Sequence, residues 1–108
     1  MKISKNSISE NDLTITFLHD IEEIIETEDG AIVLLKFWVK SGMGYNIWNN
    51  VYKINKSLEI QWQIQGAKQK CYTSIVHNND EYRAVDWDGF SNVIDMKTGK
   101  VVREYFVK

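Results

Sequence analysis

The chain has 108 residues, of which 44% are hydrophobic and 12% aromatic, and its formal net charge is −2 at pH 7. A length and apolar fraction of this kind fit a packed core, so we expect residues 1–108 to form one folded domain. The small net charge argues against a nucleic-acid partner, and the single cysteine, Cys71, excludes an internal disulfide.

The beginning of the chain is polar and acidic. Residues 1–6 lack the apolar run of a signal peptide, and the longest apolar run, 31–35, is far shorter than the roughly 20 residues of a membrane-spanning helix. We therefore expect a cytoplasmic protein with no membrane partner. Residues 1–30 hold eight acidic residues and two lysines, which predicts a local negative charge.

The first predicted strands are read from alternation and from tight turns. Leu13, Ile15 and Phe17 alternate with threonines, which predicts a strand with a period of two. Asp29-Gly30 then separates segment 20–28 from the apolar segment 31–39, and Asp-Gly between β-forming residues predicts a hairpin whose two turn residues have positive φ.

Segment 20–28 allows two interpretations. Its isoleucines at positions 21, 24 and 25 would share one face of a short helix, but the tight turn that follows favours a strand paired with its neighbour. We favour the strand and leave the helix open.

Further strands are predicted in the second half of the chain. Residues 58–65 alternate between apolar and polar side chains, which predicts one face on the core and one in water. Asp88-Gly89 predicts a second hairpin between segments 82–87 and 90–94, and Asn78-Asn79 predicts a turn just before it.

One segment is a candidate contact loop. Residues 41–46 contain two glycines, which permit positive φ and would leave Met43 and Tyr45 exposed at the tip. The alternative is an ordinary connection between strands.

Residues 92–102 resemble a hairpin found in the blades of quinoprotein-type (PQQ-like) β-propellers. The likeness rests on a strand, an Asp-x-x-Thr-Gly-Lys turn that begins at Asp95, and a second strand. Residues 50–62 are a weaker copy, in which Asn55 replaces the aspartate, Leu58 replaces the turn glycine and Trp62 stands at the blade's tryptophan position. The copies are about forty residues apart, which is a blade-like period.

The resemblance implies two blade-like units. A closed propeller needs roughly four to eight blades, so one chain of this length cannot form a ring. We expect an all-β fold: an antiparallel meander of about eight to nine strands, arranged as a sandwich or a strongly bent sheet and not as a closed propeller. Because the quinone of that family is held by a complete ring, we expect no cofactor. The layout also resembles small bacterial proteins, some of them similar to immunity proteins of toxin systems.

The polar residues do not form a catalytic or metal-binding pattern. Cys71 and His77 in one strand would lie about 20 Å apart, too far for a hydrogen bond. His19 is too distant in sequence to complete a zinc site with them. The segment 86–89 is similar to the start of a calcium loop, but its twelfth position is Lys97 instead of a glutamate. We therefore expect no enzyme activity and no bound metal.

Two functions fit these observations. We favour a non-enzymatic protein-interaction domain, such as an inhibitor or an immunity protein, whose acidic first thirty residues face a basic partner. The alternative is a small-ligand or carbohydrate-binding β domain that uses an aromatic-lined sheet. We expect most aromatic side chains to pack in the core. The candidate binding residues are Met43, Tyr45, Trp48, Trp87, Asp86 and Asp88.

Overall fold

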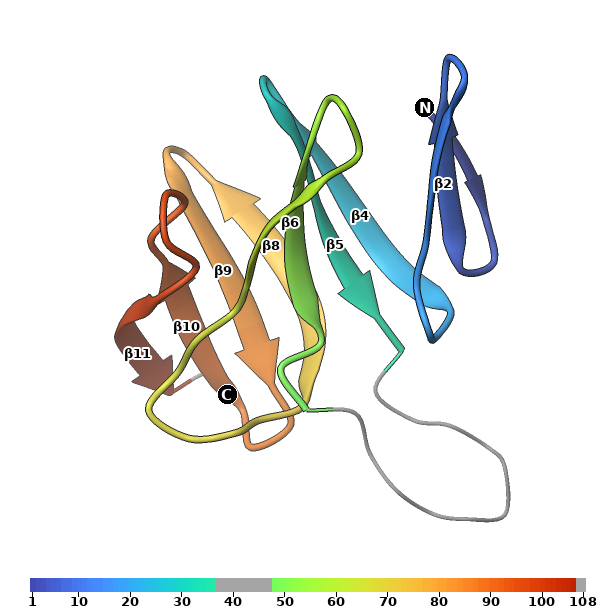
Figure 1. The fold of residues 1–108 in the computed structure, drawn as a ribbon. Coiled ribbons are helices and arrows are strands. Elements are labelled where there is room, and N and C mark those ends of the chain that lie inside the picture. The colour runs from blue at the N-terminus through green and yellow to red at the C-terminus, as the bar shows by residue number, and fades with distance from the viewer. Residues whose placement is uncertain (37–47, 107–108) are drawn as a thin grey trace, which may run out of the picture.

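The computed structural model of the chain describes residues 1–36 and 48–106. They form eleven antiparallel strands in three sheets, none of which closes into a barrel, and these described ranges contain no helix. The sheets stand side by side in Figure 1. The predicted all-β antiparallel fold is therefore confirmed, with a few more strands than the eight to nine expected.

The N-terminal sheet contains two strands that the sequence did not predict. Its strands, in the order β1-β2-β3, are β1 (Lys2–Ser4), β2 (Ser7–Glu10) and β3 (Leu13–Thr16). The turns between them use Lys5 and Asn11 at positive φ. Ile8 pairs with Ile15 and is fully buried, because this sheet lies on one face of the next.

The middle sheet contains the strand at the centre of the molecule. Its order is β4-β5-β6-β7, with β4 (Ile21–Thr27), β5 (Gly30–Leu35), β6 (Val51–Asn55) and β7 (Ile60–Gln63). Segment 20–28 is thus a strand and not a helix. Every residue of β5 is buried, which explains its continuous apolar sequence, since a strand covered on both faces needs no alternation.

The first hairpin is confirmed, but its turn lies one residue earlier than predicted. Thr27 pairs with Gly30, so Glu28 and Asp29 form the turn and Gly30 begins β5. A Cβ atom at Gly30 would lie 1.9 Å from the carbonyl oxygen of Ile54. Glycine is needed at this position because β6 passes so close to the backbone.

The alternation predicted for residues 58–65 holds only in part. Trp62 and Ile64 are buried on one side of the middle sheet, but Leu58 packs into the core on its other side. Leu58 belongs to the β6–β7 turn, where its φ is +59°, and Ile60 is half-exposed. The register shift between Lys53 and Ile54 changes which face each residue occupies.

The third sheet has the order β11-β10-β9-β8. Its strands are β8 (Tyr72–Asn78), β9 (Glu81–Asp86), β10 (Phe90–Ile94) and β11 (Val101–Phe106). The predicted Asp88-Gly89 hairpin is confirmed as a three-residue connection, in which Gly89 has a φ of +92° and donates its N–H to the carbonyl oxygen of Asp86. The predicted turn near Asn79 is also present.

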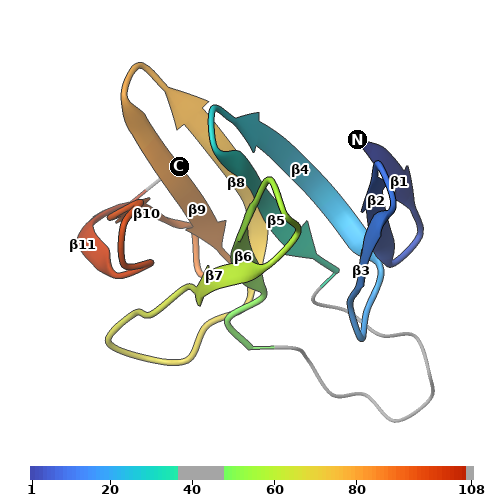
Figure 2. The same ribbon diagram turned by 45° about the horizontal axis from the view of Figure 1, so that its top comes forward.

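The middle sheet has a core on each of its faces. One core lies against the N-terminal sheet and the other against the third sheet, where β8 packs on β4 and β5. A parallel bridge between Gln65, which follows β7, and Lys100, which precedes β11, also joins the middle sheet to the third sheet. Figure 2 shows the three layers, with the N-terminus and the C-terminal strand on opposite sides of the molecule.

Candidate functional site

The structure divides the six predicted binding residues into three groups. Met43 and Tyr45 lie outside the described residues. Asp86 is buried, whereas Trp48 is 49% exposed and Trp87 is 70% exposed. Asp88 is also exposed. The expectation that tryptophans pack inward therefore holds for Trp62 and not for Trp48 and Trp87.

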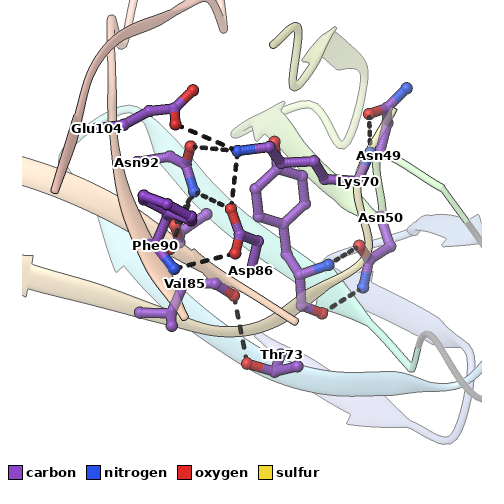
Figure 3. Close-up of polar contacts among 11 residues, drawn as sticks. Asn49, Asn50, Lys70, Thr73, Val85, Asp86, Phe90, Asn92 and Glu104 are labelled. Carbon is purple, nitrogen blue, oxygen red and sulfur yellow. Dashed lines mark hydrogen bonds and ion pairs between the residues drawn. The ribbon is translucent and has the colours of Figure 1, made fainter. Parts of the chain in front are cut away.

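Asp86 is the centre of a polar cluster at the edge of the core, drawn in Figure 3. Its carboxylate accepts a hydrogen bond of 2.9 Å from Lys70 Nζ and one of 3.0 Å from Asn92 Nδ2. Lys70 Nζ also lies 3.5 Å from Glu104 and 5.4 Å from the centre of the Phe90 ring. Side chains from three neighbouring strands, β9, β10 and β11, thus contact one lysine. Lys70 itself lies in the segment before β8.

This cluster fixes the charge of its members. Burial raises the pKa of Asp86, but the hydrogen bonds from Lys70, Asn92 and the Phe90 N–H outweigh it and hold the pKa below its usual value. Burial lowers the pKa of Lys70, and the bond and charge of Asp86, with the charge of Glu104, raise it above its usual value. Both groups stay ionised around neutral pH.

Asp86 also builds the turn that carries Trp87 and Asp88. Its Oδ1 atom accepts a hydrogen bond of 3.0 Å from the Phe90 N–H, and its carbonyl oxygen accepts one of 3.1 Å from the Gly89 N–H. The carboxylate is therefore a support for the turn. The side chains that the turn presents to solvent are those of the two following residues.

A second buried residue fixes the segment that carries Trp48. Asn50 is fully buried, and its Nδ2 atom donates to the carbonyl oxygens of Leu35 and Tyr72 at 2.7 and 2.8 Å. Its Oδ1 atom accepts from the Tyr72 N–H at 2.8 Å. Asn50 thus joins the middle sheet to the first residue of β8.

Trp48 and Trp87 are brought to one end of the molecule by these contacts. The N–H of Asn49 donates to the carbonyl oxygen of Lys70, and the N–H of Trp87 donates to that of Cys71. The segments that carry Trp48 and Trp87 are therefore hydrogen-bonded to two successive residues, Lys70 and Cys71. Figure 1 shows the entrance of β6 and the β9–β10 turn at this same end. We call Trp48, Trp87 and Asp88 the tryptophan end.

A second candidate is a hollow of about 660 Å³ between the middle and third sheets. Four carboxylates line it, those of Glu26, Glu28, Asp29 and Asp80. The rings of His77 and Tyr82 stack beside it with centroids 4.1 Å apart and planes 3° from parallel.

The same hollow contains a buried lysine. Lys53 is almost fully buried, and its ammonium lies 3.0 Å from the exposed Asp29 carboxylate. The hydrogen bond from Lys53, aided by one from Thr27, lowers the pKa of Asp29 below its usual value. The hollow therefore offers charge of both signs next to an aromatic surface.

The residues with reactive side chains stand apart from one another. Cys71 is buried directly before β8, and His77 lies near the end of that strand. Burial, and to a smaller extent the charge of Asp88, raises the pKa of the Cys71 thiol. In residues 1–36 and 48–106, no group of three or more His, Cys, Asp or Glu side chains is placed to hold a metal ion, and no helix could span a membrane.

A sequence model of the family described as Domain of unknown function (DUF7957) matches residues 1–106. The chain belongs to this family. The DUF7957 match covers all three sheets, so both candidate sites lie inside the family's domain. Neither a search of curated proteins nor a search of solved structures gave a match.

Sequence reasoning missed most of the hollow and the partners of Asp86. The acidic excess of residues 1–30 was a signal for Glu26, Glu28 and Asp29. No local pattern marked Lys70, Asn50 or the His77–Tyr82 stack, since their neighbours come from strands that are far apart in the sequence.

Proposed function

We propose that this protein is a non-enzymatic interaction domain that binds another protein through the tryptophan end. The observation that carries the proposal is the exposure of Trp48 and Trp87, at 49% and 70%, on backbone fixed by buried polar contacts. Tryptophan is the residue type that most often dominates binding energy at protein interfaces. A rigid support lowers the entropy that such residues lose on binding.

The charge of the chain supports a partner with a basic surface. Asp88 is exposed beside Trp87, at the tryptophan end itself, and Glu22 is exposed near the start of β4. Complementary charge speeds association and weakens as salt is added. An inhibitor or immunity protein that covers a basic surface of its target fits this pattern.

The experiment compares matched variants in capture from the native host at low salt. We expect the wild-type protein to retain one stoichiometric partner, and a Trp48→Ala/Trp87→Ala variant to lose it. Ile60→Ala, which removes a half-exposed apolar side chain from β7, is the control and should keep the partner. Equal retention by all three proteins would rule out the tryptophan end as the binding surface.

The second candidate function is the binding of a small ligand, and the hollow between the sheets favours it. Its carboxylates and the His77–Tyr82 stack suit a cationic or sugar-like ligand. Trp62 would report such binding, because its Nε1 atom donates a hydrogen bond of 2.8 Å to the carbonyl oxygen of Met96, which lines the hollow. A titration of tryptophan fluorescence with a Trp38→Phe/Trp48→Phe/Trp87→Phe variant leaves Trp62 as the only tryptophan of the chain and isolates this signal. No change across a panel of sugars and amines would remove the candidate.

We also propose that the middle and third sheets are two blade-like units, as the resemblance to propeller hairpins implies. The middle and third sheets are both four-stranded meanders, and their last hairpins turn at Asn55 and Asp95. Both side chains accept a hydrogen bond from the N–H two residues later. These features support a description of the two sheets as blade-like units that serve as a scaffold.

A further inference from the structure

β11 is the longest strand edge that other described strands leave uncovered. It is the outermost strand of the third sheet, and residues 102–106 form no backbone hydrogen bond with a described strand other than β10. The two seven-residue edge strands, β4 and β8, pack on each other. The edge strand β7 has only four residues.

The side chains of this edge are unusually apolar for an exposed strand. Val102 is 56% exposed and Phe106 is 66% exposed. Tyr105 is also exposed, with the guanidinium carbons of Arg83 and Arg103 at 5.4 and 5.7 Å from its ring centre. A long uncovered edge with apolar residues pairs readily with another strand.

We infer that β11 pairs with β11 of a second copy of this chain, in an antiparallel register centred on Glu104. The dimer joins two four-stranded sheets into one continuous sheet of eight strands. The alternation of side chains argues for the second copy as the occupant, because the neighbouring registers place the Glu104 carboxylate opposite an apolar side chain and this register does not.

The pairing follows from the positions of residues 102–106. In a strand that pairs antiparallel with itself at Glu104, Val102 lies opposite Phe106 of the other copy, and Arg103 lies opposite Tyr105. An apolar pair and a cation–aromatic pair both stabilise neighbouring strands. Centring on Arg103 would place Val102 opposite Glu104, and centring on Tyr105 would place Glu104 opposite Phe106, so both of those registers pair a charge with an apolar group.

The one unfavourable contact of the register has a compensating charge. The two Glu104 side chains lie opposite each other, and like charges in that position repel. In each copy Lys70 Nζ lies 3.5 Å from the Glu104 carboxylate. The repulsion is therefore reduced within each chain before the copies meet.

The test is a charge exchange across the proposed axis, measured by sedimentation equilibrium of the full chain. We expect the wild type to dimerise and the single variants Val102→Lys and Phe106→Glu each to weaken the dimer by about tenfold or more. The double variant Val102→Lys/Phe106→Glu should regain most of that loss, because each lysine then faces a glutamate of the other copy. Ile60→Lys on β7 is the matched control and should leave the dimer unchanged.

Two results would overturn the inference. A wild-type protein that stays monomeric at every concentration has no such dimer, and a dimer that both single variants leave intact uses another surface. A second measurement does not depend on the charged variants: Glu104→Cys should cross-link two copies under mild oxidation, because the two side chains face each other within reach of a disulfide. A folded Glu104→Cys protein that fails to cross-link while Ile60→Cys does so would also contradict the register.

Discussion

Trp62 of β7 packs its indole ring directly against Gly99 in the turn between β10 and β11. A Cβ atom at Gly99 would lie 2.6 Å from the Cδ2 and Cε3 atoms of the ring, and the φ of Gly99 is +78°. The ring also donates its N–H to the carbonyl oxygen of Met96 in the same turn. A single tryptophan of the middle sheet thus holds the last hairpin of the third sheet in place.

Gly99→Ala should destabilise the protein strongly. The methyl group collides with the indole, and the positive φ disfavours any residue with a side chain, so we expect a loss of about 2–3 kcal/mol in the free energy of unfolding. Urea denaturation followed by circular dichroism measures it. Gly66→Ala is the control, since its nearest contacts at 3.4 Å are ordinary and its variant should remain close to wild type.

Asn50→Ala should also destabilise the fold. The substitution removes three hydrogen bonds that the Asn50 side chain makes with backbone groups of Leu35 and Tyr72. We expect a loss of about 3 kcal/mol, measured by chemical denaturation. Asn49→Ala, which removes only a contact of 3.5 Å with the Lys70 N–H, should cost much less. Equal losses in the two variants would show that Asn50 does not join the sheets.

Asp86→Asn should change how stability depends on pH. The pKa of Asp86 is lowered in the folded protein, so its contribution is present above the unfolded-state value of about 4 and is lost as the pH falls through the folded value. We expect the variant to lose about 3 kcal/mol at neutral pH, because Lys70 loses its closest partner, and to show a shallower loss on acidification. Asp29 and Glu81 also have lowered pKa values, so part of the acid dependence remains. Parallel acid profiles for variant and wild type would contradict the assignment.

Tyr72→Phe should stabilise the protein. The Tyr72 hydroxyl is buried and has no hydrogen-bond partner in the described structure, so its removal should gain about 1 kcal/mol. Burial, with the charges of Asp86 and Glu104, raises its pKa to about 12. Because the folded state disfavours the ionised phenol, the wild type should lose stability as the pH rises from about 10, the unfolded value, towards 12, whereas the phenylalanine variant should not show this loss. Thermal unfolding at neutral and alkaline pH measures both effects, and a destabilised phenylalanine variant would indicate a partner for the hydroxyl.

The parts of the fold that sequence could predict are those specified by neighbouring residues. The hairpins at Asp29-Gly30 and Asp88-Gly89 were predicted because turn chemistry is local. Their details were not, since the position of Gly30 depends on the close approach of Ile54 from β6. The polar strands β1 and β2 carry little pattern of their own, and only their packing on the middle sheet explains them.

The candidate sites depended even more on distant contacts. Asp86 was predicted as a binding residue, because nothing near it in the sequence indicated that it would be buried and paired with Lys70. The likeness between Asn55 and Asp95 was visible, but Leu58 at positive φ shows that the first turn keeps its shape without glycine. Its burial in the core offsets the backbone strain of that conformation.

The enclosure of β5 has a consequence for how the molecule opens. This strand is bonded on both edges and covered on both faces, so its amide protons should exchange with solvent deuterium only when the whole domain unfolds. The N-terminal sheet is covered by the rest of the chain on a single face, and its amides should exchange earlier. We expect the N-terminal sheet to unfold first and the strands around β5 to unfold last.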